Sequence, residues 1–240
     1  MGVAAVSLLT TSGLTRHFSG IHAVEGVDFT LEAGEIRALI GSNGAGKTTL
    51  VSMICGRIPP SAGEIHFDGR DITRWPAHRR IMAGMAYTFQ ISSIYAGLPV
   101  FENVALAARR KRRGRAAEAA TQEALMRVGL WERADQPAGD LAYGHQRLLE
   151  IAMGLAQSPR LLILDEPTQG LSEGEIAAFK ALIRELAPAT TILLIEHNMS
   201  VVMELAERVT VMDMGRILAE GTPAEIRANR AVQAAYLGTG

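Results

Sequence analysis

The stretch that decides the fold is Gly41-Ser42-Asn43-Gly44-Ala45-Gly46-Lys47-Thr48. It matches the pattern G-x-x-x-x-G-K-[ST], in which glycines allow consecutive backbone N–H groups to turn inward around a phosphate. Residues 36–40 before it predict a short buried strand, and residues 49–55 after it predict the first turns of a helix. Because a helix N-terminus has unpaired N–H groups and a partial positive charge, it favours an anion. The stretch therefore predicts a site for a nucleoside triphosphate.

Two side chains of this loop add chemistry to its amides. Lys47 can reach the β- and γ-phosphates, and the Thr48 hydroxyl can ligate Mg²⁺. The alternative is a Gly-rich turn with a solvated lysine, but strand, loop and helix follow one another in the required order. The residues predicted to contact the nucleotide here are Gly41, Ser42, Asn43, Gly44, Ala45, Gly46, Lys47, Thr48 and Thr49.

The composition is that of a globular chain. A net charge of −1 over 240 residues gives no overall case for binding nucleic acid. The single cysteine, Cys55, cannot form an internal disulfide, which suits a reducing compartment. No uncharged apolar run approaches the roughly 20 residues of a spanning helix, so we expect that the protein does not cross a membrane by itself. Residues 1–15 lack the basic start of a secretory signal and are expected to lead into an edge strand.

Two α/β segments flank a helix-rich one. Residues up to about Gly69 predict strands joined by tight turns, followed by a helix at 76–84 and a strand at 85–89. The composition from residue 91 to 157 favours helices, and buried strands return at 161–164 and 191–195.

This order predicts a single domain over residues 1–240. Residues 1–90 and 158–240 are assigned to a nucleotide-binding α/β core, and residues 91–157 to an inserted helical subdomain. Capping boxes at 172–175 and 222–225 predict helix starts, the second of them for the last helix.

Polar side chains follow the predicted buried strands. Asp165 and Glu166 come directly after one strand, at the edge where ligands of open α/β sheets collect. Asp165 is the expected Mg²⁺ partner of Thr48, and Glu166 can orient an attacking water and accept its proton. Helix capping is the alternative for both carboxylates. His197 and Gln90 end neighbouring strands, and Gln90 could bond both Mg²⁺-bound water and the nucleophile.

Upstream of the loop, Phe18 is followed by Val24. An aromatic ring here could stack on a nucleobase, and a half-buried strand residue is the equal alternative. A lone histidine such as His197 is more often structural, but its place on the same edge as Asp165 favours a functional role.

Together these residues resemble the ATP-binding subunits of ABC transporters over nearly the whole chain. The order is Phe18 (base stacking), Gly41–Thr48 (P-loop), Gln90 (Q-loop), Leu141–Gln146 (signature), Asp165 and Glu166 (Walker B), Thr168–Ser172 (D-loop) and His197 (H-loop). The resemblance implies a P-loop ABC ATPase core with an antiparallel β subdomain and an inserted α-helical subdomain, and ATP and Mg²⁺ as cofactors. The implied roles are catalysis for Glu166, His197, Gln90 and Lys47, base contacts for Phe18 and Val24, and Mg²⁺ binding for Thr48, Gln90 and Asp165.

The signature is the most specific part of the resemblance, because other P-loop families lack it. In ABC ATPases it comes from a partner subunit and places a helix N-terminus against the γ-phosphate on the opposite P-loop. The resemblance implies contacts in trans from Ala142, Tyr143, Gly144 and Gln146. The family usually has serine where this chain has Ala142. Loss of that hydroxyl should cost roughly 0.5–1.5 kcal/mol and slow closure without abolishing it.

Within the family, short segments resemble the ATPases of branched-chain amino-acid importers. They are residues 88–90, 101–104, 195–199, 220–223 and 235–238. The resemblance implies ATP hydrolysis that energises uptake of branched-chain or other amino acids. Urea or amide import, lipopolysaccharide export and a soluble non-transport ABC ATPase are the alternatives. A DNA-repair ATPase would need a long coiled coil between Lys47 and Asp165, and no sustained heptads occur there.

The resemblance also implies partners and a location. The partners are a second ABC ATPase subunit (identical or related), integral membrane permease subunits and, for import, a solute-binding protein, with no nucleic acid. The location is the cytoplasmic face of a bacterial-type cell membrane, as a peripheral subunit. Residues 91–101, apolar and broken by Pro and Gly, could form a groove for a short permease helix. The basic run at 109–115 is either a solvated helix end or a contact for anionic lipid or nucleic acid.

Overall fold

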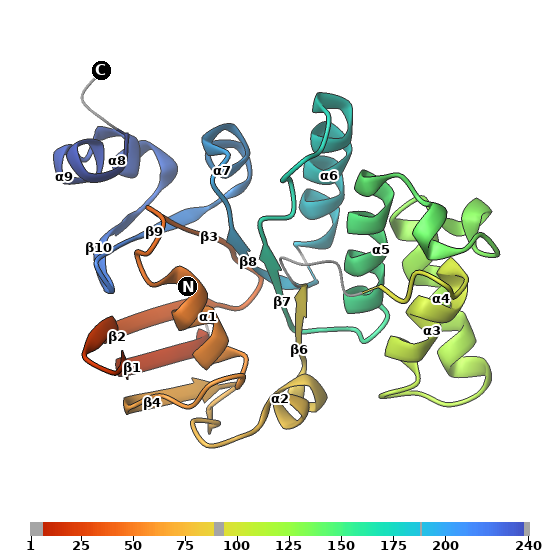
Figure 1. Ribbon diagram of the computed structural model, residues 1–240, viewed down its shortest axis with the longest axis horizontal. Coiled ribbons are helices and arrows are strands. Elements are labelled where there is room, and N and C mark those ends of the chain that lie inside the picture. The colour runs from red at the N-terminus through yellow and green to blue at the C-terminus, as the bar shows by residue number, and fades with distance from the viewer. Residues whose placement is uncertain (1–6, 89–93, 188, 238–240) are drawn as a thin grey trace, which may run out of the picture.

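The strands form two sheets of different type. In the computed structural model, which describes residues 7–88, 94–187 and 189–237, a four-stranded antiparallel sheet has the order β2-β1-β4-β5 and a six-stranded, mostly parallel sheet has the order β10-β9-β3-β8-β7-β6 (Figure 1). The strands are β1 (Ser7–Phe18), β2 (Ile21–Glu32), β3 (Ile36–Gly41), β4 (Ala62–Phe67), β5 (Arg70–Asp71), β6 (Met85–Thr88), β7 (Leu161–Asp165), β8 (Thr191–Ile195), β9 (Arg208–Asp213) and β10 (Arg216–Gly221).

β1 is not an edge strand, so that expectation is wrong. It pairs antiparallel with β2 on one side and with β4 on the other. Leu9 shows this directly, since it lies opposite Leu31 in β2 and opposite Phe67 in β4. The alternation of one strand predicts its buried face but carries no information about which of its edges are paired.

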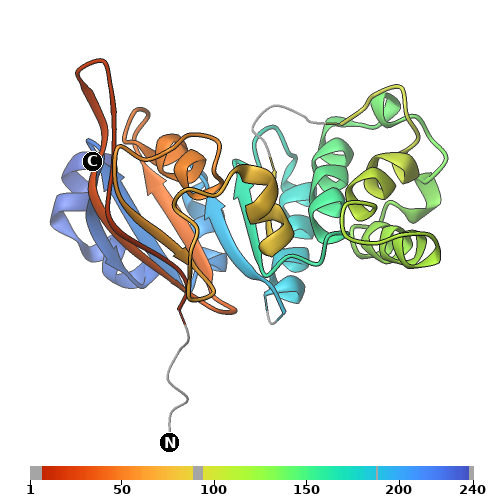
Figure 2. The same cartoon turned by 90° about the horizontal axis from the view of Figure 1, so that it is seen from below.

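The helices gather in groups around the larger sheet. They are α1 (Lys47–Ile54), α2 (Ala77–Ala83), α3 (Val100–Ala108), α4 (Arg115–Arg127), α5 (Tyr143–Leu155), α6 (Glu173–Leu186), α7 (Met199–Leu205), α8 (Pro223–Ala228) and α9 (Arg230–Val232). Among the described residues, single turns of 3-10 helix lie at Trp131–Arg133 and Ala138–Asp140, and a turn of π-helix lies at Gln233–Leu237. Because β6 and β7 are adjacent and parallel, α3, α4 and α5 form an insertion between neighbouring strands, at one end of the molecule (Figures 1 and 2).

Both predicted capping boxes are present. Ser172 and Glu175 cap α6, and Thr222 and Glu225 cap α8, where Pro223 occupies the first turn. The second box does not begin the last helix, however. α9 follows α8, and the Asn229 side chain caps it by accepting hydrogen bonds from two backbone N–H groups. A single Asn is a weaker sequence signal than a capping box, which is why this short helix was missed.

The central strands are buried on both faces. Leu162 and Leu164 of β7 pack with the helices of the insertion, whereas Ile163 packs toward α1 and the antiparallel sheet. α1 fills the space between the two sheets, with Leu50 and Met53 fully buried there. This two-sided burial explains why β7 and β8 are uninterrupted apolar runs instead of alternating ones.

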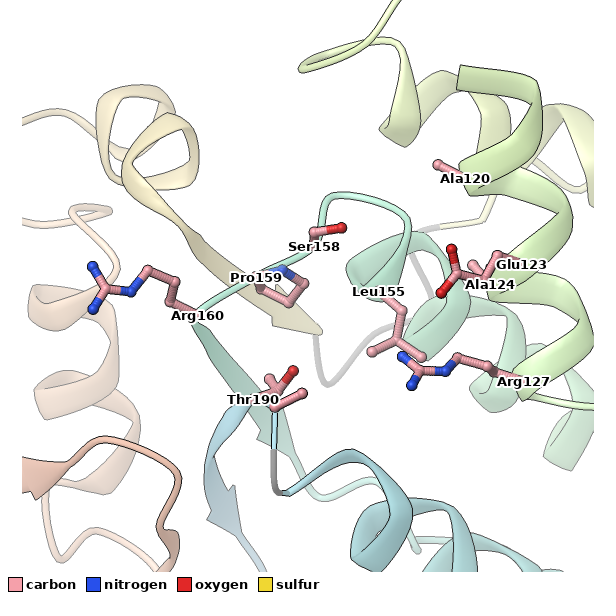
Figure 3. Close-up of a pocket in the computed structure, with 10 residues that line it drawn as sticks. Ala120, Glu123, Ala124, Arg127, Leu155, Ser158, Pro159, Arg160 and Thr190 are labelled. Carbon is pink, nitrogen blue, oxygen red and sulfur yellow. The ribbon is translucent and has the colours of Figure 1, made fainter. Parts of the chain in front are cut away.

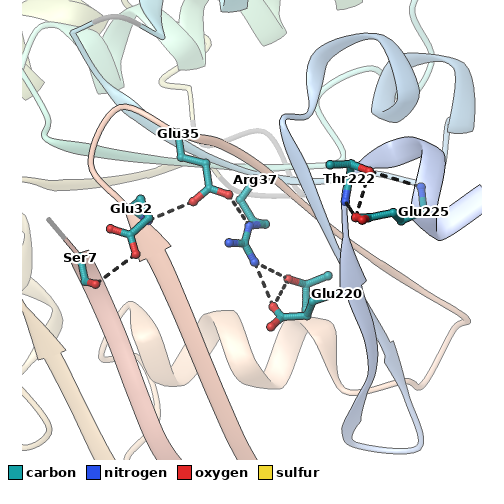
Figure 4. A network of polar contacts seen from close by, with 8 residues as sticks. Ser7, Glu32, Glu35, Arg37, Glu220, Thr222 and Glu225 are labelled. Atoms are coloured by element: carbon teal, nitrogen blue, oxygen red, sulfur yellow. Dashed lines mark hydrogen bonds and ion pairs between the residues drawn. The ribbon is translucent and has the colours of Figure 1, made fainter. Parts of the chain in front are cut away.

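A buried cation fixes β3, the strand that leads into the glycine-rich loop. Arg37 is 3% exposed. Its Nε donates to Glu35 Oε1 at 2.6 Å, and its Nη1 donates to Glu220 Oε1 and Thr210 Oγ1, both at 2.9 Å (Figure 4). Removing one partner of such a buried ion pair costs about 3–5 kcal/mol. The network therefore holds β3, the strand that leads into the loop, to β9 and β10.

Candidate functional site

The glycine-rich loop forms a tight turn between β3 and α1. Gly46 is the N-cap of α1 with φ 101°, and a Cβ at this position would lie 2.4 Å from the Ala23 carbonyl oxygen. Only glycine fits both the conformation and the space. Among the described side chains, none caps the start of α1. The first N–H groups of the helix are therefore available to an anion.

Lys47 lies across the loop. Its Nζ donates to the carbonyl oxygens of Gly41 at 2.7 Å and Ser42 at 3.0 Å. Burial lowers the pKa of Lys47, while the negative charges of Glu166 and Asp165 act in the opposite direction and favour the charged form. A buried ammonium group thus lies where the sequence predicts the phosphates.

Asp165, at the end of β7, is 3% exposed. Its Oδ2 accepts a hydrogen bond of 2.7 Å from the Tyr87 hydroxyl. Burial raises the pKa of Asp165, and the Tyr87 bond and Lys47 partly offset this. Burial, and then the bond to Asp165, raises the pKa of Tyr87. Tyr87 therefore donates to a carboxylate that the sequence predicts to bind Mg²⁺.

Glu166 has a strained backbone that directs its carboxylate. Its φ is 49°, which costs a non-glycine residue about 1–3 kcal/mol. Its N–H donates to the Ile195 carbonyl oxygen at 2.8 Å. Glu166 Oε1 lies 2.8 Å from His197 Nε2, and the two side chains are 15% and 38% exposed. A partly exposed carboxylate oriented by a histidine is suited to hold a water molecule and accept its proton.

Glu196 joins the loops that follow β7 and β8. One of its oxygens, Oε1, accepts from Thr168 N at 2.9 Å and Thr168 Oγ1 at 2.6 Å. The other, Oε2, accepts from the backbone N–H groups of His197 at 3.0 Å and Asn198 at 3.2 Å. With the residue only 3% exposed, these four bonds satisfy a buried carboxylate. Glu196 thereby fixes the backbone that carries His197.

Residues 43–49 of the loop and the start of α1 line one pocket of about 340 Å³ together with Glu166 and His197. Ile21, His22, Ala23 and Met214 complete its wall on the side of β2 and the β9–β10 turn. The structure thus brings together the loop and the ends of β7 and β8, which are distant in sequence. The arrangement offers amides, an ammonium group, a hydroxyl and a carboxylate to a single ligand.

The two predicted base contacts, Phe18 and Val24, are not among the described residues that line this pocket. Phe18 is 39% exposed, with the Arg16 guanidinium 4.5 Å above its ring, whereas Val24 is fully buried in the core. The Val24 side chain therefore offers no surface to a nucleotide in this structure. Gln90 lies outside the described residues.

Comparison with known proteins decides the family. A family model described as ABC transporter matches residues 24–169, a span that includes the loop, the signature and the pair Asp165 and Glu166. The chain belongs to the ABC transporter family. A second model, described as branched-chain amino acid ATP-binding cassette transporter, matches residues 216–240 of this ABC ATPase.

Named relatives agree with this assignment. The chain is 39% identical to the high-affinity branched-chain amino acid transport ATP-binding proteins BraF of Pseudomonas aeruginosa and LivG of Escherichia coli K12, over 96% of this chain and 98% of each relative. It is 33% identical to the lipopolysaccharide export system ATP-binding protein LptB of Escherichia coli K12, over 97% of this chain and 98% of that one. The ABC ATPase is thus a nucleotide-binding enzyme whose family couples ATP hydrolysis to transport.

Solved structures show the same architecture. The crystal structure of the ADP conformation of MJ1267, an ATP-binding cassette of an ABC transporter, superposes with a TM-score of 0.89 at 26% identity, over 98% of this chain and 100% of that one. The dimeric structure of the cassette MJ0796 bound to ADP and Pi superposes with a TM-score of 0.80 at 23% identity, over 90% of this chain and 98% of that one. At this identity the likeness supports the fold alone. The expected ABC ATPase fold, with its antiparallel and helical parts, is confirmed.

The signature of this ABC ATPase does not line its own P-loop pocket. Leu141–Gln146 leads into α5, in the helical insertion (Figure 1). Ala142 is an exposed N-cap, and no described side chain caps the helix. Gly144 packs so closely against α6 that a Cβ would lie 1.9 Å from Glu175 Oε1. Gln146 Nε2 donates to the Leu141 carbonyl oxygen at 3.0 Å, and Tyr143 is 45% exposed.

The described residues form other pockets outside the P-loop site. A groove of about 510 Å³ runs between β6, α3 and α5, and its walls include Tyr87, Tyr95, Arg110 and Met153. A pocket of about 260 Å³ is lined by residues of α4, by Ser158–Arg160 and by Thr190 (Figure 3). The second pocket lies where β7 and β8 begin, opposite the ligand-binding edge of the sheet.

The basic run at 109–115 has internal partners at two positions. Arg112 donates to the Ala156 carbonyl oxygen and the Ser158 hydroxyl, both at 2.8 Å, and so ties the run to the end of α5. Arg109 pairs with Glu102 at 2.9 Å. These contacts favour the structural interpretation of the run. Within the described ranges, no helix is long and apolar enough to span a membrane.

Proposed function

We propose that this ABC ATPase hydrolyses Mg·ATP at an interface with a second ATPase subunit and so energises uptake of branched-chain or other amino acids. The observation that carries the proposal is the convergence of Lys47, Glu166 and His197 in one pocket with the P-loop amides. The cargo rests on the 39% identity to BraF and LivG over nearly the whole of each chain.

The residues around the pocket divide the chemistry between them. Lys47 and the loop amides stabilise the charge on the β- and γ-phosphates. The Thr48 hydroxyl and the Asp165 carboxylate are hard oxygen ligands of the kind that Mg²⁺ prefers, so the donor set fits this ion. When bound, Mg²⁺ neutralises phosphate charge. Tyr87 orients Asp165 by donating to its Oδ2.

Hydrolysis uses the pair of Glu166 and His197. Glu166 accepts a proton from the attacking water, and His197, 2.8 Å away, holds the carboxylate in position and contacts the γ-phosphate. Gln90 belongs to the same proposal as a second sensor of the γ-phosphate and as a ligand of Mg²⁺, and Phe18 as the residue that stacks on the base.

The second half of the site comes from another subunit. The signature residues Ala142, Tyr143, Gly144 and Gln146 contact the γ-phosphate held by the opposite P-loop, through the amino end of α5. ATP favours this closed dimer over ADP only through contacts that the γ-phosphate makes. The MJ0796 cassette is described as a dimer bound to ADP and Pi.

The groove between β6, α3 and α5 is the proposed docking site for the permease. Tyr95 and Leu106 give it exposed apolar surface, and it lies where core and helical insertion meet. A short amphipathic helix from an integral membrane subunit fits this position. Residues 91–101 were predicted to form this groove, and of these residues 91–93 lie outside the described residues. The subunit then sits peripherally at the cytoplasmic face of the membrane, with a solute-binding protein supplying the cargo.

Reconstitution tests the proposal. The complex is purified from membranes, its components are identified, and it is placed in liposomes with ATP available to the ATPase subunit. We expect uptake of labelled leucine that requires ATP and is lost in the Glu166→Gln complex. Because LptB is 33% identical, lipopolysaccharide export is the second candidate. If lipopolysaccharide stimulates ATP hydrolysis by the complex and amino acids do not, the protein belongs to an exporter and not to an importer.

A further inference from the structure

The β1–β2 hairpin carries a cluster of metal-ligating side chains outside the P-loop machinery. His17 of β1 and His22 of β2 are opposite each other in the strand register, and Glu25 follows on β2. Glu25 Oε2 lies 2.7 Å from His17 Nε2 and 2.6 Å from His22 Nδ1. One ligand atom from each residue lies within 4.8 Å of the other two. Two imidazole nitrogens and one carboxylate oxygen thus converge on one point from two strands.

We propose that His17, His22 and Glu25 bind one divalent transition-metal ion of the zinc class. Two histidines and one glutamate form a donor set typical of zinc sites that keep an open coordination position. With metal–ligand distances of about 2.0–2.2 Å, tetrahedral ligand atoms lie about 3.3 Å apart. The two histidine–glutamate separations, now 2.7 and 2.6 Å, must therefore lengthen by little more than half an ångström. Imidazole ligands also select against Mg²⁺ and Ca²⁺.

The positions of the three residues allow this adjustment. The side chains of His17, His22 and Glu25 are 39%, 63% and 28% exposed, so the histidine rings can turn and water can occupy the remaining coordination position. Glu25 is the fixed member, because its backbone N–H donates to the Gly215 carbonyl oxygen at 2.8 Å. The competing interpretation is a purely hydrogen-bonded cluster in which each histidine donates one proton to Glu25.

A metal here would act next to the nucleotide. Phe18, the last residue of β1, directly follows His17, and His22 itself lines the P-loop pocket. A metal that joins His17 to His22 would restrict the motion of the neighbouring Phe18 ring, which the proposed function assigns to base stacking. This consequence rests on that proposed function. Metal and Mg·ATP should then raise each other's affinity by the same factor.

Metal binding is measured without nucleotide. The chain, with any affinity tag removed and dialysed against a chelator, is titrated with ZnCl₂ in a calorimeter. We expect one site per chain with micromolar or tighter affinity, resistant to millimolar Mg²⁺. His17→Ala, His22→Ala and Glu25→Gln should each weaken binding at least about tenfold. His78→Ala, which removes an exposed histidine of α2, is the matched control and should bind zinc like the unchanged chain.

Several results would overturn the site. The first is that the chain binds no stoichiometric zinc. The second is that all three substitutions leave zinc binding intact. The third is that His78→Ala weakens zinc binding as much as they do. Zinc held instead by Glu166 and His197 would give the second result. Circular dichroism melting curves of the three variants check that they fold, since His17 and His22 are exposed on the hairpin and Glu25 is half-buried. If the chain binds zinc but not Mg·ATP, the proposed function is contradicted and the metal site is supported.

Discussion

The amino ends of α1 and α5 carry related chemistry in different surroundings. α1 begins at Gly46 beside Lys47, Glu166 and His197, inside a pocket. α5 begins at Ala142, exposed and in the helical insertion. In Figure 1, β6 and β7 lie between α1 and α5. One chain therefore contains two uncapped helix starts, and the proposed function assigns a phosphate to each of them, on opposite subunits.

The capping of the helices shows the same contrast. α6 and α8 begin with complete capping boxes, in which Ser172 or Thr222 and a glutamate satisfy the first N–H groups. In the described structure neither α1 nor α5 has a side-chain cap. Uncapped N–H groups favour an anion. α2, α3 and α4 also begin without a side-chain cap, so a missing cap alone does not identify a phosphate site. What distinguishes the start of α1 is the pocket that it shares with Lys47, Glu166 and His197.

The largest expected effect lies on the α1 side. In Glu166→Gln the amide cannot accept the proton of the attacking water, so hydrolysis should fall about 10²–10⁴-fold. Affinity for Mg·ATP, measured by calorimetry, should change less than about twofold. The same variant should form an ATP-dependent dimer in light scattering. Normal turnover would remove Glu166 from the mechanism.

A substitution on the α5 side should affect the dimer and spare the binding of nucleotide by the single chain. In Gly144→Ala the new methyl group would lie 1.9 Å from Glu175 Oε1, so α5 or the α6 cap must shift. Overpacking of this kind costs about 1–3 kcal/mol of folding stability, seen in the melting curve. Because a shifted α5 start no longer meets the opposite γ-phosphate, ATP-dependent dimerisation should weaken as well. Gly174→Ala is the control, because a Cβ there meets nothing within 4 Å. Equal loss of Mg·ATP binding in the Gly144→Ala monomer would contradict the division between the two helix starts.

Glu196→Gln tests the link between the loops that carry His197 and Thr168. The amide replaces one accepting oxygen by a donor that faces N–H or O–H groups. Leaving buried donors unsatisfied should lower the free energy of unfolding by about 1–3 kcal/mol in urea titrations. Turnover should fall while the Kd for Mg·ATP stays unchanged, because the P-loop is untouched. Glu196→Asp, which keeps the charge, should recover part of the turnover. Turnover equal to that of the unchanged chain would make Glu196 a purely structural residue.

The smallest effect is expected from Ala142→Ser. A serine at the N-cap of α5 adds a hydroxyl that can donate to the γ-phosphate across the dimer. The gain should be roughly 0.5–1.5 kcal/mol, seen as a two- to tenfold rise in ATPase rate or in ATP-dependent dimerisation. Serine can also cap its own helix, so melting curves of the monomer separate the two effects. No change in rate or dimerisation would mean that Ala142 does not face a phosphate.

The sequence could predict the α1 half of the site because local patterns specify it. Gly41–Thr48 is a contiguous motif, and Asp165, Glu166 and His197 directly follow strands whose apolar runs identify them. Tyr87 and Glu196 were missed. The bond from Tyr87 to Asp165 depends on the pairing of β6 with β7, across the whole helical insertion, and chain order does not reveal that pairing.

Side-chain direction was the other limit. Val24 was assigned to the nucleotide from its place after Phe18, yet its side chain turns into the core, and the neighbouring residues Ile21, His22 and Ala23 line the pocket instead. The register shifts between β1 and β2 determine which side chains of β2 face the core. These shifts depend on the pairing along the whole hairpin. Glu196 directly precedes His197, but a single acidic residue does not reveal the four donors that surround it.

The most direct test is a calorimetric titration of the isolated chain with Mg·ATP, alongside Lys47→Ala. The unchanged chain should bind one nucleotide, in competition with ADP. Lys47→Ala should bind about ten- to a hundredfold more weakly, since a buried ammonium contact to phosphate is lost. Lys180→Ala, which removes a lysine paired with Glu204, should behave as the unchanged chain. Absence of binding by the unchanged chain, or equal binding by Lys47→Ala, would contradict the assignment of the α1 pocket to the triphosphate.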